Sequence, residues 1–214
     1  MKARKILVSV AALALVAAIS IGGTLAYLTS TDKVENTFTV GKVNIVLDEA
    51  KANTDGTLVE GAKRVQANEY HLLPGHTYNK DPMVTVKGGS EDCYVKMTVT
   101  FTNAKELDAI FASEGGADMT SIFKGYSDAN WIAKNITKDE TANTRTYEFW
   151  YKEKVESSAG DNALDALFDQ IVVPGEITKE QLATIEGMKI IVNAYAVQAD
   201  GFKDAAEAWT TVKF

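Results

Sequence analysis

The chain has 214 residues, of which 46% are hydrophobic and 24% are charged, a balance typical of a globular protein with a substantial core. The formal net charge of −7 argues against clustered lysines and arginines that bind nucleic-acid phosphates, so we expect no nucleic-acid partner. The single cysteine, Cys93, excludes an intramolecular disulfide. We expect Cys93 to be a small buried hydrophobe at the start of a strand; a reactive thiol or an intermolecular link is the alternative.

Residues 1–26 have the layout of a cleavable signal peptide. A basic start, Lys2–Lys5, precedes an apolar run over residues 6–21, and small residues precede the bond between Ala26 and Tyr27. The apolar run is short for a membrane span of about 20 residues. We therefore predict cleavage between Ala26 and Tyr27, secretion, and contact with the membrane only before cleavage. A permanent N-terminal anchor is the alternative.

The N-terminal part of the mature chain contains a predicted strand. Residues 27–36 are polar, and residues 38–47 alternate between apolar and polar side chains with a change of phase at Gly41. This pattern predicts a strand with a bulge or bend at Gly41. Residues 50–68 are polar with a turn signal at Asp55-Gly56, which indicates a loop or weak hairpin. A strand end is expected at residues 72–73, a turn at 74–75 and a short strand at 83–86.

Alternation is clearest over residues 95–101, a predicted half-buried strand. A helix is predicted over 104–113, and two strands, at 131–132 and 147–151, flank a polar turn over 137–143. In the second of these strands, Tyr147, Phe149 and Tyr151 share a face and are expected in the core. Trp150 lies on the other face, where a helix or another subunit is expected to cover it.

The last quarter of the chain mixes helices and strands in the prediction. A helix is expected over 162–170 with Asp161 as its cap, and a strand and turn over 171–175. Residues 178–186 are expected to form a helix, because Thr178 and Gln181 match a capping box. Residues 188–198 predict a central strand, since both of its faces are nonpolar. A helical turn at 205–209 and a strand at 211–214 complete the chain.

Many short strands, helices in the connections and the absence of an interdomain linker predict one mainly β domain, an antiparallel β-sandwich with short helical insertions. The sequence shows no catalytic set. Its two histidines, His71 and His76, straddle Pro74-Gly75 and do not share a helical face, so they lack the spacing of zinc ligands. Acidic neighbours of Cys93 disfavour its thiolate. We therefore expect no catalytic residue, no metal and no cofactor.

Several motifs resemble one family. The stretches 23–29 and 36–41 look like the signal junction of proteins processed by the SipW-type signal peptidase. Leu73-Pro74-Gly75 followed by residues 80–82 and 93–96 resembles the first body motif of the TasA–camelysin family, and residues 193–202 with Ala208-Trp209 resemble its closing strand. The order and spacing of these motifs together carry the resemblance, and residues 104–170 carry no matching motif.

The resemblance implies a jelly-roll-like sandwich over residues 42–214 and a fibre-forming protein of the biofilm matrix. Such a protein is secreted to the extracellular matrix or cell surface of a Gram-positive bacterium. Its partners are copies of itself or related subunits and, during export, the signal peptidase. In such fibres the mature N-terminal segment, here 27–41, is donated as a strand to the next subunit. The assembly strand comprises Thr37, Phe38, Thr39, Val40 and Gly41.

Three alternatives remain open at the level of the sequence. The N-terminal strand can pair within its own subunit, since an open sheet edge accepts a strand from either source. The protein can be a minor adhesin or anchoring subunit of such fibres. Camelysin-like members have been described as metalloproteases, so a secreted metalloprotease is the rival class.

Overall fold

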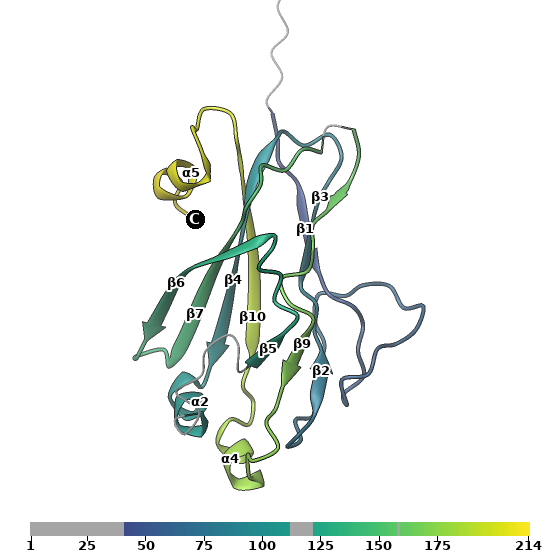
Figure 1. The fold of residues 1–214 in the computed structure, drawn as a ribbon, viewed down its shortest axis with the longest axis vertical. Coiled ribbons are helices and arrows are strands. Elements are labelled where there is room, and N and C mark those ends of the chain that lie inside the picture. The colour runs from purple at the N-terminus through teal and green to yellow at the C-terminus, as the bar shows by residue number, and fades with distance from the viewer. Residues whose placement is uncertain (1–40, 112–121, 158) are drawn as a thin grey trace, which may run out of the picture. The chain divides into compact units, whose positions relative to one another are not determined.

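The computed structural model describes residues 41–111, 122–157 and 159–214 (Figure 1). The predicted signal peptide (1–26), the cleavage bond between Ala26 and Tyr27, and Thr37, Phe38, Thr39 and Val40 of the assembly strand lie outside the described residues. Gly41 is the first residue described. Among the described residues, no helix is both long enough and apolar enough to cross a membrane.

Three antiparallel sheets form the body (Figure 1). The largest has the order β10 (Ile190–Gln198), β4 (Cys93–Thr102), β7 (Thr144–Tyr151), β6 (Trp131–Asp139). The second has the order β1 (Ile45–Asp48), β3 (Met83–Val86), β8 (Asn162–Ala163), and the third β2 (Thr77–Asn79), β9 (Gln170–Val172), β5 (Phe123–Lys124). The prediction of a mainly β, antiparallel sandwich with short helices is confirmed.

The core fills the space between the four-stranded sheet and the two smaller ones. Along β4 every second residue is fully buried, from Cys93 to Phe101, as strict alternation predicts. Tyr147 and Phe149 of β7 are also buried, as predicted. Tyr78 of β2 and Val84 of β3 belong to the same cluster, which joins the layers into one core.

In the described ranges, short helices flank the sheets: α2 (Ala104–Ile110), α4 (Lys179–Thr184) and α5 (Ala205–Thr211). The predicted capping box is confirmed, because Gln181 N donates to Thr178 Oγ1 and Thr178 N donates to Gln181 Oε1. α5 packs on the outer face of the large sheet, where Trp209 and Ala208 join Val197 and Trp150 in a second apolar cluster. Trp150 therefore lies beneath a helix, one of the two predicted outcomes.

The predicted helix over 162–170 is wrong. Asn162–Ala163 forms β8 and the chain reaches β9 at Gln170 through an irregular loop. Leu164 and Leu167 are buried at helix-like spacing, but their backbone N–H groups donate to Val84 O and to Pro82 O. Cross-chain pairing therefore overrides local spacing here. Asp161 accepts from Gly88 N at 2.8 Å and caps no helix.

The largest topological error concerns the strand predicted over 188–198. It forms β10, but β10 pairs only with β4 among the described residues and so lies at an edge of its sheet, not at the centre. Its outer face is apolar in part because α5 covers Tyr195 and Val197. The strand expected at 211–214 is also wrong, since α5 extends to Thr211.

The structure also differs from the prediction in smaller ways: one turn is shorter and two short strands are additional. β6 continues to Asp139, so the turn before β7 is shorter than predicted. The short strands β2 and β5 were not predicted, because two or three residues carry too little periodicity. The Asp55-Gly56 turn is present within a weak hairpin, in which Ala52 and Leu58 form an isolated bridge.

Candidate functional site

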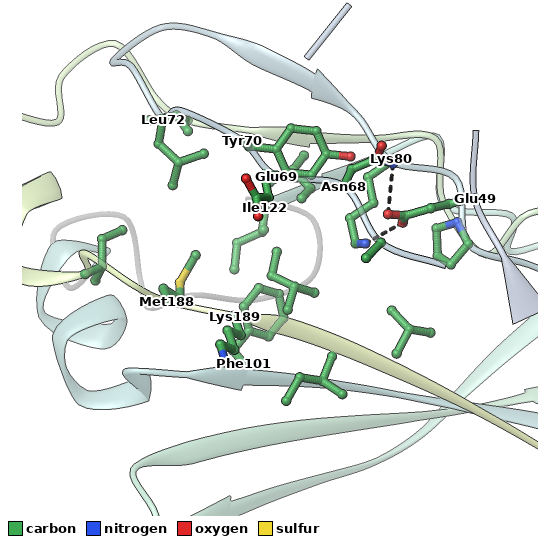
Figure 2. Close-up of a pocket in the computed structure, with 18 of the residues that line it drawn as sticks. Glu49, Asn68, Glu69, Tyr70, Leu72, Lys80, Phe101, Ile122, Met188 and Lys189 are labelled. Carbon is green, nitrogen blue, oxygen red and sulfur yellow. Dashed lines mark hydrogen bonds and ion pairs between the residues drawn. The ribbon is translucent and has the colours of Figure 1, made fainter. Parts of the chain in front are cut away.

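An apolar groove of about 980 Å³ lies between β1 and the first half of β10, over the sandwich interior (Figure 2). In Figure 2, Tyr70 and Leu72 line one wall of this groove, whereas Met188 and Lys189 lie on the opposite side. The partly buried apolar side chains along the groove are Ile45, Leu47, Leu72, Met188, Ile190 and Val192. These side chains pack on the core below and line the groove above.

The β10 wall offers apolar side chains and, on its side away from β4, backbone that no strand of the described residues pairs with. Thr102 N donates to Lys189 O at 3.1 Å, which places the backbone groups of Lys189 on the β4 side. Backbone groups alternate between the two sides of an antiparallel strand, so Ile190 and Val192 direct their N–H and C=O groups to the open side. Their side chains pack against the core. This edge can therefore accept a further strand.

The β1 wall has the same property over a shorter length. Lys87 N donates to Asn44 O at 2.9 Å, so Ile45 and Leu47 direct their backbone groups away from β3. Glu49 follows Ile45 and Leu47 in the set of alternate residues whose backbone groups point away from β3. Glu49 and Val65 exchange two backbone hydrogen bonds of 2.8 Å. The loop that contains Val65 therefore closes the β1 edge at Glu49, and the open part of this edge ends there.

A buried ion pair occupies one end of the groove (Figure 2). Lys80 Nζ donates to Glu49 Oε2 at 2.5 Å, and the two residues are only 8% and 5% exposed. Asn68 Nδ2 donates to Glu49 Oε1 at 3.0 Å. Burial and then the Glu49 charge raise the pKa of nearby Tyr70 well above its ordinary value. We call Glu49, Asn68 and Lys80 the polar end of the groove.

The polar end has unused hydrogen-bonding capacity. An ammonium group carries three N–H donors. Among the described residues, Glu49 Oε2 is the one acceptor hydrogen-bonded to the Lys80 ammonium, Nζ. Two donors of a buried cation that lines the groove are thus available to whatever enters it. A charged pair in an apolar site is costly to desolvate, so its presence is a strong constraint on the occupant.

The chain enters β1 at the far end from the ion pair. Gly41 lies against Glu91, since a Cβ at position 41 would come within 2.8 Å of Glu91 Oε1. Glu91 N donates to Lys42 O at 3.0 Å, and Asn44 N donates to Ser90 Oγ at 3.1 Å. Residues 42–44 therefore continue the β1–β3 pairing and run away from the groove.

The other residues considered in the sequence are not brought together. His71 and His76 are exposed, and no group of three or more His, Cys, Asp or Glu residues among those described is placed to hold a metal. Cys93 is fully buried at the start of β4, as expected. Burial, and then the charge of Asp92, raise the pKa of its thiol to about 11, so this thiol is not activated.

Comparison of the chain with protein-family models, with curated proteins and with solved structures found no match. The resemblance to the TasA–camelysin family therefore stays a prediction. The groove itself was missed in the sequence, because its walls come from segments far apart in the chain. The ion pair had a weak signal: Glu49 and Lys80 each lie within a few residues of a predicted strand, but nothing local pairs them.

Proposed function

We propose that this protein is a secreted structural subunit of an extracellular biofilm-matrix fibre, in which the N-terminal segment 27–41 of one copy is donated as a strand to the groove of the next. The observation that carries this proposal is the groove. It combines open backbone at Ile190 and Val192 with an unfilled apolar surface over the core. Strand addition satisfies both, since the main chain supplies hydrogen bonds and alternate side chains fill the groove.

The donor sequence has the matching pattern. Phe38 and Val40 alternate with Thr37 and Thr39, so a strand over 37–40 presents two apolar side chains to the groove and two hydroxyls to the solvent. Full burial of a side chain such as Phe or Val contributes about 1.5–3 kcal/mol. Gly41 follows this segment directly and leads into the donor's own β1.

The geometry favours a second copy as the donor. Leu47 lies six residues beyond Gly41, about 20 Å along an extended chain. Phe38 lies three residues before Gly41, so the two α-carbons are at most about 11 Å apart. Phe38 of the same copy therefore cannot lie beside Leu47. Gly41 and Gln198 line the same pocket at the other end of β10. Gln198 lies six residues, about 20 Å, from Val192 along this strand.

Head-to-tail donation is not self-complementary and does not close, so it produces filaments. Cleavage of the signal between Ala26 and Tyr27 frees the donor from the membrane and permits assembly after export. The same donor and groove also suit a minor anchoring subunit. Such a subunit would bind a major fibre protein but would not polymerise alone, which the assembly experiment separates.

The test uses the mature chain, residues 27–214, examined by negative-stain electron microscopy and by sedimentation. The unaltered protein is expected to form filaments, and Phe38→Asp is expected to leave soluble monomers because it places a charge in the apolar groove. Thr39→Asp, on the opposite face of the donor strand, is expected to weaken assembly far less. Ile136→Asp is the matched control, since Ile136 is 62% exposed on β6, at the opposite edge of the large sheet.

Filaments from Phe38→Asp of the same length and yield as the unaltered chain would overturn strand donation. A block by Ile136→Asp alone would instead place the contact at β6. Failure of the unaltered mature chain to polymerise, together with binding to preformed fibres, would assign it the anchoring role.

A further inference from the structure

We propose that Asn36 of the incoming copy binds the polar end of the groove and thereby fixes the register of the donated strand. This inference rests on the proposed function. The positions 36, 38 and 40 fall on one face of a strand, because side chains alternate with a period of two. The face that presents Phe38 and Val40 to the groove therefore also presents Asn36, a polar side chain next in line.

A buried Asn is costly unless its amide is hydrogen-bonded. Its carboxamide has one oxygen acceptor and two N–H donors. The polar end offers the complementary groups, since Lys80 Nζ has donors to spare and the carboxylate of Glu49 accepts. The same contact supplies a further partner, besides Glu49, to the ammonium group of Lys80, a residue that is only 8% exposed. The Asn36 carboxamide and the ion pair can therefore hydrogen-bond to each other.

Register follows from this pairing. A slip by one residue turns Thr37 and Thr39 inward and Phe38 outward. A slip by two residues keeps the apolar face inward but brings Phe38 or Val34 against the ion pair and buries Asn36 among apolar side chains. Alternation alone cannot reject the two-residue slip. To specify register is the best-attested role of a single buried polar residue.

The partner must again be a second copy. Glu49 lies eight residues beyond Gly41, about 26 Å along the extended segment that pairs with β3. Asn36 lies five residues before Gly41 and reaches at most about 18 Å from it. The α-carbon of Asn36 therefore stays at least about 8 Å from that of Glu49 in its own chain, too far for Asn36 to lie on a strand paired beside Glu49.

The experiment measures the critical concentration for assembly of the mature chain in a double-mutant cycle. The donor change is Asn36→Val, and the melting transition of this variant checks that its core is intact. The acceptor change is the pair Glu49→Leu with Lys80→Met, since a buried ion pair replaced by apolar residues is often neutral for folding. Asn68 keeps its hydrogen bond to Ala50 O in that variant. Asn135→Val, at an exposed position of β6, is the matched control.

We expect Asn36→Val to raise the critical concentration about 10-fold, the effect of one unsatisfied buried polar contact. The acceptor pair is expected to raise it by a similar factor, and the combination to return it to within about threefold of the unaltered chain. Asn135→Val is expected to leave it unchanged.

An unaltered critical concentration for Asn36→Val, or additive effects without recovery in the combination, would overturn the Asn36 contact. If the acceptor pair does not fold, as judged by its melting transition, the donor change alone decides the question. Phe38→Asp in the same assay separates the two proposals. If Phe38→Asp blocks assembly and Asn36→Val has no effect, strand donation stands and the register contact fails; if neither has an effect, strand donation itself fails.

Discussion

Replacement of Lys80 by Met tests how much the ion pair at the polar end matters to the folded subunit. Lys80→Met keeps the length and apolar stem of the side chain but leaves the Glu49 carboxylate buried at 5% exposure, with only the Asn68 amide as a side-chain partner. Removal of one partner of a buried pair costs about 3–5 kcal/mol, because the remaining charge is desolvated without compensation. For a domain of this size, each kcal/mol lowers Tm by about 2–4 °C, so we expect a fall of about 6–20 °C.

The assay is urea unfolding and thermal melting at a protein concentration where sedimentation shows a monomer, with free energies from linear extrapolation. Lys154→Met is the matched control: Lys154 binds Asp92 at the same 2.5 Å, but both side chains are about 40% exposed, so a far smaller change is expected. The double variant Glu49→Leu with Lys80→Met is expected to recover most of the loss. A cost below about 1 kcal/mol for Lys80→Met would show that water or structural relaxation satisfies Glu49, and would refute the reasoning.

Three further predictions concern other parts of the fold. Thr178→Ala removes the capping box of α4 and is expected to cost about 1 kcal/mol in urea unfolding. Trp209→Ala is expected to increase hydrogen exchange in α5, with β4 and β7 still protected, because Trp209 anchors α5 on the outer face. Cys93 is expected to react with Ellman's reagent at pH 8 only on unfolding. Because its folded pKa is raised to about 11, the unfolded thiol ionises first and stability is expected to fall as the pH rises from about 9 to 11.

Sequence patterns correctly predicted the helices and strands that depend mainly on interactions between residues close in the chain. Strict alternation located β4 and the inner face of β7, and two side chains three residues apart located the start of α4. The wrong predictions concern elements whose position depends on contacts with segments far away in the chain. The apolar residues of β10 looked central, but one face is covered by α5 and the open edge follows from which strands pair, which no local pattern contains.

The sequence predicted the proposed donor strand but not the groove that the proposal assigns to it. Phe38 and Val40 show the alternation of a strand within the sequence itself. The groove depends on the contact between Glu49 and Lys80, which are 31 residues apart in the chain. It also depends on the backbone N–H and C=O groups of Ile190, which point away from β4. Both follow from sheet topology. Asn36 and Phe38 fall on the same face of a strand, but this matters only if that strand enters a groove with a polar end. The sequence alone therefore did not single out Asn36.

An open strand edge above an exposed apolar groove is an aggregation hazard, and edges of this kind are usually blunted by charge, bulges or cover. Within the part of the chain that the structure describes, the groove walls at Ile190, Val192 and Leu47 carry no such protection, whereas a buried charge pair lies at one end. A purely apolar groove would accept any alternating strand in several registers. The ion pair penalises every occupant that fails to bring a hydrogen-bonding group to that end. If the proposed strand donation holds, Glu49 and Lys80 make this edge select its strand, and a fibre in which every subunit contact is identical requires such selection.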